Sequence, residues 1–304
     1  MARTRIVRTE EVVGPRLGRL LIGTDFSSGA RAAITRVGKL PLEARAEVVL
    51  AYVIPAGGDL FVDRGAELSV QKLVEEETRF LRRLLPATVR VRNELVRGRP
   101  FDALFELGSR LQPELMVMGR HGERAVRDDL LGSTAERVLQ LANRPVLVVS
   151  RIAKGPYKRA LAAVDLELGS LEILAAGLRI SGVKPKQVSL VHAFQGSQVP
   201  GQKKPGRKEA TRLREARLEA IENGLRMELT PFPALATEAH IVIREGDPRE
   251  VLAEQVQEQK ADLLVVGTHG RTGYARAMLG SVAQSLVRRT PCDVLVVPTP
   301  LSER

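Results

Sequence analysis

Cysteine, histidine and long apolar runs are scarce in this sequence of 304 residues. Cys292 is the only cysteine, which excludes an internal disulfide framework and a zinc site built on thiolates. The 4 histidines form no spaced cluster, so a transition-metal site is not expected. No apolar run approaches the roughly 20 residues of a membrane helix, and residues 1–8 lack the apolar core of a signal peptide. We therefore expect a cytoplasmic protein without a membrane span.

Aromatic residues are also few, at 3% with no Trp, which leaves little on which single-stranded bases could stack. The net charge is +11 and the pI is about 10.3. That balance favours an anionic partner: a nucleotide, nucleic acid or an acidic protein. Binding to a duplex backbone stays open through charge alone, although the lack of aromatics makes nucleic acid the weakest of the three.

One glycine-rich pattern occurs twice, 148 residues apart. The first copy is GRHG at residues 119–122 followed by Gly132, and the second is GTHG at residues 267–270 followed by Gly280. Each copy follows an apolar run and precedes a helical pattern. A strand, a glycine turn and a helix start supply backbone N–H groups for an anion. Glycine also lets the main chain approach phosphate oxygens closely.

A serine stands at each of these helix starts. The sequence from Ser133 to Glu136 fits the S-x-x-E capping box, and the sequence from Ser281 to Gln284 fits S-x-x-Q. Each hydroxyl could cap its helix or meet a phosphate oxygen. Two copies with identical glycine spacing favour the anion site over a cap alone.

The surrounding pattern predicts strands that alternate with helices, which favours a parallel α/β sheet with right-handed crossovers. In the first half, strands are expected at 19–24, 47–54, 89–96, 115–118 and 145–149, and helices at 28–40, 67–85, 98–108 and 133–141. The second half repeats this order with about eight extra residues, which we place in the Gly-, Pro- and Lys-rich stretch 195–208. The division falls near residues 150–157, giving domains 1–152 and 153–304.

The strand ends indicate where a ligand would bind. Asp25 and Asp165 end the first strands, and Gly119 and Gly267 end the fourth. If the strand order is 3-2-1-4-5, strands 1 and 4 are neighbours at the point where the crossover direction reverses, and ligands bind in that crevice. A dinucleotide-binding fingerprint would need glycines after strand 1, where none stand, and the nearest approach to a P-loop, at residues 196–203, is best explained by chance.

The spacing G-x2-G-x9-G-[S/T] resembles the ATP-binding signature of the universal stress protein family. The TDFS stretch at residues 24–27, the G-x-P turns at 98–100 and 246–248, and the closing run 144–149 are also similar. The resemblance covers nearly the whole chain as two tandem domains. It implies that each is a doubly wound, adenine nucleotide alpha hydrolase-like domain with a five-stranded parallel sheet of order 3-2-1-4-5 flanked by helices.

The resemblance also implies a binding site in each half. The residues at the end of the first strand would contact the adenine–ribose end, one residue of the second strand would line the adenine pocket, and the glycine stretch would hold ribose and phosphates. The positions so assigned are Thr24, Asp25, Val53, Gly119, Gly122, Gly132, Ser133 and Thr134 in the first half, and Val164, Asp165, Ala193, Gly267, Gly270, Gly280, Ser281 and Val282 in the second. Such domains pair through their last strands, so an internal pseudo-dimer is expected, and a further homodimer stays open.

The second half departs from the pattern. Residues 164–167 lack the TDFS stretch, and Val282 lacks the hydroxyl of Thr134, so the second site is in some doubt. Arg124, Arg127, Arg271 and Arg276 could neutralise phosphate or simply be solvated, and Asp128 with Asp129 could help to hold Mg²⁺ or lie in a solvated loop.

Other polar residues carry weaker hypotheses. His121 and His269 lie inside the glycine turns without a neighbouring nucleophile, which favours packing over acid–base work. His192 could touch adenine, and His240 is expected to open a strand. Cys292 is expected to be a small buried hydrophobe. The basic helix at residues 212–226 could grip an acidic protein or be a solvated face.

We therefore predict a protein that binds ATP, ADP or AMP, with or without Mg²⁺, and acts in stress response or signalling through its conformation or an unknown protein partner. No catalytic residue is assigned, and an enzyme is the less favoured alternative: at most a slow ATPase or a nucleotidyl-transfer protein. A nucleotide-free interaction scaffold is the other alternative.

Overall fold

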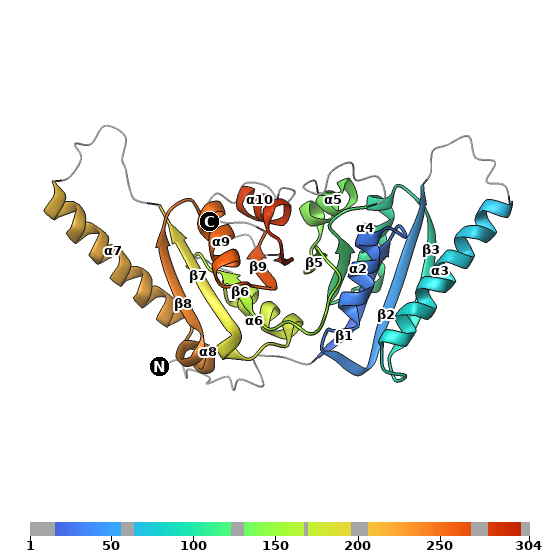
Figure 1. The fold of residues 1–304 in the computed structure, drawn as a ribbon, viewed down its shortest axis with the longest axis horizontal. Coiled ribbons are helices and arrows are strands. Elements are labelled where there is room, and N and C mark those ends of the chain that lie inside the picture. The colour runs from blue at the N-terminus through green and yellow to red at the C-terminus, as the bar shows by residue number, and fades with distance from the viewer. Residues whose placement is uncertain are drawn as a thin grey trace.

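The computed structural model describes residues 16–55, 64–122, 131–166, 170–195, 206–268 and 279–298. Within these residues, ten strands form one continuous sheet (Figure 1). The strands are β1 (Leu17–Thr24), β2 (Leu42–Pro55), β3 (Arg90–Gly98), β4 (Leu115–Gly119), β5 (Val146–Val149), β6 (Ala160–Ala163), β7 (Val188–Phe194), β8 (His240–Glu245), β9 (Leu263–Gly267) and β10 (Asp293–Val297). The helices are α2 (Ser28–Val37), α3 (Arg64–Leu84), α4 (Pro100–Leu111), α5 (Ser133–Leu141), α6 (Ser170–Ser181), α7 (Arg207–Glu228), α8 (Pro233–Glu238), α9 (Pro248–Glu258) and α10 (Ser281–Arg289), with a 3₁₀ turn η1 (Pro185–Gln187).

Strand order is the same in the two halves. The first half runs β3-β2-β1-β4-β5 and the second runs β8-β7-β6-β9-β10, with parallel neighbours throughout, so the predicted order 3-2-1-4-5 is confirmed. The halves meet at β5 and β10, which pair antiparallel with Val148 opposite Val294. The pairing of last strands that the family resemblance implies is therefore present within this one chain.

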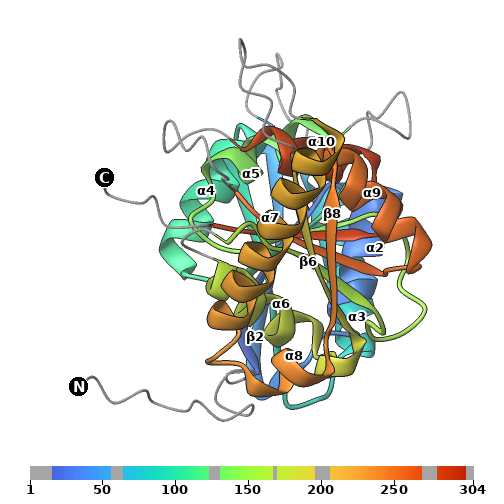
Figure 2. The same cartoon turned by 90° about the vertical axis from the view of Figure 1, so that its left-hand side faces the viewer.

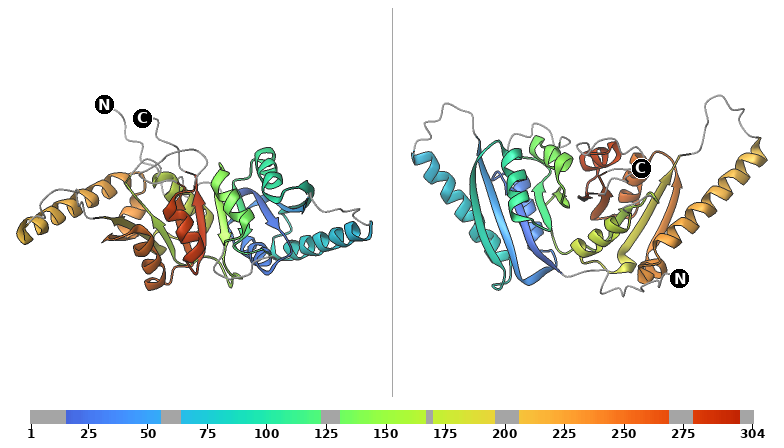
Figure 3. Two further views of the ribbon diagram at one scale, coloured as in Figure 1. Left: turned by 90° about the horizontal axis from the view of Figure 1, so that it is seen from above. Right: turned by 180° about the vertical axis from the view of Figure 1, so that it is seen from behind.

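Helices cover both faces of the sheet, as the side and end views show (Figures 2 and 3). Leu20 and Ile22 of β1 pack into the core beneath α2, α3, α6 and α7, whereas Leu21 packs into the core beneath α4, α5, α9 and α10. A parallel strand that is buried on both faces reads as a continuous apolar run rather than as an alternating one. Because helices bury both faces of the sheet, its strands stand out in the sequence as apolar runs.

Unusual backbone conformations recur at matching positions in the two halves. Phe26 and Leu166 follow the first strands, 140 residues apart, with φ of 64° and 62°. Gly98, the last residue of β3, and Gly246, the residue after β8, are 148 residues apart and have φ of 147° and 155°. Few residues other than glycine adopt a positive φ. The turn after the first strand is therefore strained in both halves, although Phe26 occupies the strained position in one and Leu166 in the other.

Two features differ from the sequence-based expectation. The helix expected to reach residue 40 ends at Val37, and its start is capped by Ser27, whose Oγ accepts the N–H of Ala30. The eight extra residues of the second half do not all lie in 195–208. The chain passes from α3 to β3 in five residues (85–89), but it takes eleven residues (229–239) from α7 to β8 and forms α8 on the way.

A buried cluster holds the two halves together beside the β5–β10 pairing. The Asp293 carboxylate of β10 is 1% exposed and accepts hydrogen bonds from Arg36 Nε (2.7 Å), the Tyr157 hydroxyl (2.8 Å) and the main-chain N–H of Ser150 (3.0 Å). Arg36 also donates to the carbonyl of Gly155 (2.9 Å), and its guanidinium lies 4.0 Å from the centre of the Tyr157 ring. One carboxylate of the second half thus joins a helix of the first half to the connecting segment.

Candidate functional site

The carboxyl ends of β1 and β4 lie side by side, because these two strands pair in parallel. The chain leaves β1 through Asp25 and leaves β4 through the turn of Gly119 and Gly122. A Cβ added to Gly122 would lie 2.5 Å from Asp25 Oδ2, so the carboxylate lies directly against the glycine turn. The structure therefore brings together the aspartate and the glycine turn at the switch point of the sheet, as the sequence predicts.

The turn after β1 is held by a chain of local hydrogen bonds. The N–H of Phe26 donates to Thr24 Oγ1 (3.1 Å), and the N–H of Ser27 donates to Asp25 Oδ1 (3.1 Å). Phe26 stacks on Tyr52 of β2, with ring centroids 4.5 Å apart. These contacts stabilise the positive φ of Phe26 and fix the direction in which Asp25 projects.

Sequence reasoning missed a residue beneath this turn. Glu77 of α3 is 6% exposed, and its Oε2 accepts a hydrogen bond of 2.6 Å from the hydroxyl of Thr24. Burial raises the pKa of the Glu77 carboxyl above its ordinary value, and the Thr24 hydrogen bond opposes that rise. The sequence does contain a sign of this buried residue: Glu77 interrupts the apolar stripe of α3 between Val74 and Leu81, where a helix normally buries only apolar groups.

The glycines of the first turn serve different purposes. A Cβ on Gly119 would lie 2.4 Å from the carbonyl carbon of Gly29, and one on Gly29 would lie 2.1 Å from the carbonyl oxygen of His121. These two glycines let the turn pack against the start of α2. At Gly132 the nearest atom to an added Cβ is the carbonyl oxygen of Arg120, at 3.4 Å, which is ordinary contact. Packing therefore explains the glycine at position 119 but not the one at position 132. Close approach of a ligand, the reason expected from sequence, stays a prediction for Gly132.

Both predicted capping boxes are wrong. The cap residues are Gly132 and Gly280, neither helix has a side-chain cap, and the serines occupy the first helical positions. The cause is a contact between the halves: Glu136 of α5 accepts hydrogen bonds from Gln284 (2.7 Å) and Arg288 (2.5 Å) of α10 instead of turning back to its own helix start. The last residues of the two predicted boxes, Glu136 and Gln284, therefore bond to each other.

The start of α5 consequently keeps its anion-binding character. The first N–H groups of an α-helix have no carbonyl partner within the helix, and its dipole favours negative charge there. Gly132 donates its own N–H to the carbonyl of Arg120 (2.9 Å), which holds the helix start beside the glycine turn. Gly280 makes the matching bond to Thr268 (2.7 Å) in the second half.

Arg120 lies within the first glycine turn, but its side chain belongs to the contact between the halves. It is 7% exposed, and Nη2 donates to the carbonyls of Thr290 (2.5 Å) and Cys292 (3.1 Å). Burial lowers the pKa of the guanidinium, and the position is Thr268 in the second half. The first turn therefore contacts the other half directly.

The corresponding turn of the second half has apolar residues, Val164 and Leu166, on either side of Asp165. Val164 follows β6 and is buried, its carbonyl lies 2.8 Å from His192 Nδ1, and Asp165 is partly exposed. His192 is thus a buried residue bonded to the main chain. Val53 is buried within the core beneath α4, and its counterpart Ala193 is partly buried beside the same core.

Some of the remaining predicted site residues lie in the described part of the chain and others lie outside it. Thr134 and Val282 are partly buried at the second positions of α5 and α10, and Gly267 ends β9. The following predicted residues lie outside the described part of the chain: Gly270, His269, Arg124, Arg127, Arg271, Arg276, Asp128 and Asp129. Their predicted contacts with phosphate or Mg²⁺ stay predictions.

Two smaller expectations are confirmed: His240 opens β8, and Cys292 is buried just before β10. Burial also raises the pKa of the Cys292 thiol to about 12.

Among the described residues, no group of three or more His, Cys, Asp or Glu side chains is arranged to hold a metal ion, and no helix is long and apolar enough to span a membrane.

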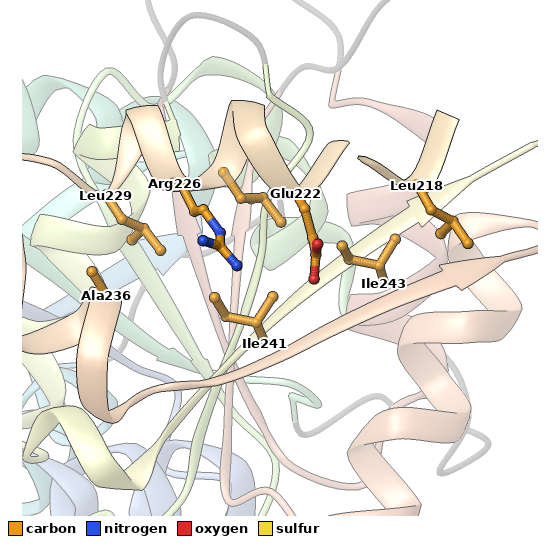
Figure 4. Close-up of a pocket in the computed structure, with 8 residues that line it drawn as sticks. Leu218, Glu222, Arg226, Leu229, Ala236, Ile241 and Ile243 are labelled. Carbon is orange, nitrogen blue, oxygen red and sulfur yellow. The ribbon is translucent and has the colours of Figure 1, made fainter. Parts of the chain in front are cut away.

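A groove of about 710 Å³ lies between α7, α8 and β8 (Figure 4). Apolar side chains line most of it, and Glu222 and Arg226 of α7 stand at its edge. An apolar lining with one charge of each sign does not suit a polyphosphate. The end of the sheet that carries the glycine turns is therefore the better candidate for an anionic ligand.

The model of the universal stress protein family matches residues 17–150 and again residues 156–298. The chain belongs to this family. Universal stress protein MJ0531 of Methanocaldococcus jannaschii is 29% identical over 157 residues, which cover 51% of this chain and 90% of that protein. Universal stress protein Rv2005c of Mycobacterium tuberculosis is 25% identical over 211 residues, 68% of each chain.

A solved structure supports the tandem arrangement of this universal stress protein. The crystal structure of a universal stress protein from Archaeoglobus fulgidus has a TM-score of 0.65 and covers 92% of this chain and 98% of its own. At 19% identity that likeness concerns the fold alone. Family membership and fold are thus shown, while the ligand has to be argued from the site.

Proposed function

We propose that this tandem universal stress protein binds an adenine nucleotide, ATP, ADP or AMP, at the switch point of its first half. The observation that carries the proposal is the start of α5: a helix N-terminus whose cap residue, Gly132, offers no side chain, close to the glycine turn against which Asp25 lies. A helix start favours negative charge, and among the described residues no side chain caps this one, so phosphate is the fitting ligand.

The residues take distinct roles in this proposal. The main-chain N–H groups and hydroxyls of Ser133 and Thr134 hold phosphate oxygens. Asp25 accepts hydrogen bonds from the ribose hydroxyls, since a carboxylate is the natural acceptor for a diol. Val53, at the end of β2, lines the adenine. Mg²⁺ enters bound to the phosphates, because the described residues offer no group arranged to hold it alone.

The second half offers a reduced version of the site. Gly280 and Ser281 begin α10 as Gly132 and Ser133 begin α5, again without a side-chain cap. The turn after β6 carries Asp165 but has Val164 in place of Thr24. We propose that this site binds nucleotide more weakly.

The biological role we propose is stress response or signalling in the cytoplasm. Nucleotide in the first half would act on the contact between the halves, because Arg120 joins the glycine turn to Thr290 and Cys292. A change there alters the surface that a partner protein, or a second copy of the chain, would meet. We place the domain boundary at 152/153.

The test is the nucleotide content and ATP affinity of the purified protein. Release of nucleotide on denaturation, measured by anion-exchange chromatography, and ATP titration by calorimetry are compared for wild type, Gly132→Val and Gly280→Val. Gly206→Val is the matched control, because Gly206 caps α7 with similar backbone angles and has no atom within 4 Å of an added Cβ. We expect loss of binding at one site for each of the first two variants and none for the control.

The same measurements separate the alternatives. ATP turnover that scales with protein and disappears in Gly132→Val would favour the slow enzyme. Failure of wild type to bind added ATP would overturn the nucleotide proposal and leave the scaffold.

A further inference from the structure

The two halves differ at one buried pair beneath the turn after their first strand. In the first half the pair is Thr24 and Glu77, which are 8% and 6% exposed and joined by a hydrogen bond of 2.6 Å. In the second half the position of Thr24 is taken by Val164, 4% exposed. The first half therefore buries a carboxyl group at the very place where its candidate ligand site begins.

The partner of Val164 follows from the alignment of the long helices. Buried or partly buried apolar positions of α3 and α7 match at one offset: 218 − 74, 225 − 81 and 229 − 85 all equal 144. Since 221 − 77 is also 144, Ile221, 7% exposed, stands in α7 where Glu77 stands in α3. Both members of the polar pair are thus replaced by apolar residues together.

The second half therefore acts as an internal control for the fold. It builds the same turn, with Leu166 at φ 62° against Phe26 at φ 64°, without the polar pair. Burying a carboxyl group is unfavourable, and an apolar pair of similar shape is often at least as stable. The fold alone does not require Glu77, so its retention in the half that keeps the TDFS stretch indicates a role in binding.

Hydrogen bonds connect Glu77 to the site. The Thr24 hydroxyl donates a hydrogen bond to Glu77 Oε2. With its proton directed there, Thr24 Oγ1 is oriented to accept a hydrogen bond from the N–H of Phe26, at an N–O distance of 3.1 Å. The next residues of the same turn place Asp25 against Gly122. A hydroxyl that already donates a hydrogen bond accepts one from an N–H group better than a hydroxyl that is free to rotate.

Charged groups around Glu77 come from two other elements. Arg31 of α2 acts on the carboxyl as a positive charge, and its guanidinium lies 3.5 Å from the centre of the Phe80 ring. Asp25 acts as a negative charge from the turn after β1. Arg31 thus offsets part of the repulsion between the two carboxyl groups.

We propose that Glu77 is the positioning residue of the first nucleotide site: through the hydroxyl of Thr24 it fixes the turn that presents Asp25 to the glycine turn. The first site then binds nucleotide more tightly than the second, which lacks this connection. The inference rests on the nucleotide-binding function proposed above.

The experiment measures ATP affinity at one site at a time. Gly280→Val blocks the second site, so ATP binding in this variant reports on the first site. Gly132→Val blocks the first site, so ATP binding in that variant reports on the second. We expect the first site to bind ATP at least about tenfold more tightly, the effect of one hydrogen bond to a charged group. In the Gly280→Val background, Thr24→Val with Glu77→Ile gives the first half the pair of the second half and is expected to lose about tenfold in affinity.

Two further variants separate positioning from stability. Glu77→Gln keeps an acceptor for Thr24 and should retain affinity within about threefold, a rescue that a purely structural carboxylate would not show. Thr78→Val is the matched control, because Thr78 is buried one position along α3 but bonds its own helix at Val74. Circular dichroism and urea unfolding establish that each variant is folded.

The outcomes are distinct. If the folded Thr24→Val, Glu77→Ile chain binds ATP within about threefold of its background, Glu77 has no positioning role. If Glu77→Gln loses as much affinity as the apolar pair, the carboxylate acts through its charge and not as an acceptor, which also overturns the inference. If the Gly280→Val background itself fails to bind ATP, the nucleotide proposal and this inference fail together.

Discussion

Replacing Asp293 with alanine should destabilise the whole protein, because its carboxylate accepts hydrogen bonds from two buried side chains and one partly buried N–H group of the first half and the connecting segment. In Asp293→Ala the Arg36 guanidinium keeps its bond to the carbonyl of Gly155 but loses its counter-charge. The hydroxyl of Tyr157 and the N–H of Ser150 lose their partner as well. The first half has Pro145 at the matching position, 148 residues earlier, so no second copy of the cluster compensates.

The magnitude follows from the burial of the ion pair. Removing one partner of a buried pair typically destabilises a protein by about 3–5 kcal/mol, since the other charge stays buried without compensation. The side chains of Arg36 and Asp293 are 7% and 1% exposed, which puts this pair in that class. Replacing the group together, as Arg36→Leu, Tyr157→Phe and Asp293→Leu, removes the polar atoms along with their partners and should be clearly less destabilising than Asp293→Ala.

The assay is equilibrium unfolding in urea, followed by far-ultraviolet circular dichroism. Separation of one transition into two in Asp293→Ala would show that the cluster couples the halves, because domains that unfold independently no longer share one cooperative transition. A loss below about 1 kcal/mol, the range of exposed ion pairs, would refute the reasoning. So would a combined variant that is as unstable as Asp293→Ala.

Three other results are expected from the structure. Gly119→Ala should be strongly destabilised in urea unfolding, because its Cβ would lie 2.4 Å from the backbone of Gly29, whereas Gly132→Ala, with 3.4 Å of space, should unfold like wild type; equal losses would contradict the contacts described. The thiol of Cys292 should resist alkylation at pH 8 in the native state and react fully in denaturant, because burial raises its pKa to about 12; native labelling at the denatured rate would show that the junction opens. Burial raises the pKa of Glu77 in the folded state, so this group favours folding most at pH values below its ordinary pKa and loses that contribution as the pH rises through the folded value. Across that interval, the free energy of unfolding of Glu77→Gln should therefore increase relative to that of wild type in urea unfolding. A difference that does not change with pH would refute the linkage.

Local pattern was sufficient for the elements and their order. The apolar runs report contacts within one strand, and the structure confirms the alternating strands and helices that they predict. The ligand that the glycine spacing predicts stays a prediction. The placement of Asp25 against Gly122 also followed, because parallel strands bring their carboxyl ends to one edge of the sheet. That placement also depended on the strand order 3-2-1-4-5, which the family resemblance implies.

Contacts between distant residues were not predictable in this way. Glu136 looked like part of a capping box until the structure placed Gln284, 148 residues later, within reach. Glu77 bonds Thr24 across 53 residues, and Asp293 bonds Arg36 across 257. Nothing in a local window distinguishes such a carboxylate from a solvated one, because the partner is fixed only when the sheet is assembled.

The antiparallel pairing of β5 with β10 has a consequence for how the two halves can evolve. A chain holding a single half would leave its last strand unpaired and would need an identical copy, so every substitution would appear in both sites and assembly would weaken on dilution. Here the second half is covalently attached, and the pairing is independent of protein concentration. One half can therefore keep Thr24 and Glu77 while the other carries Val164 and Ile221, so the two sites can differ within one assembled sheet.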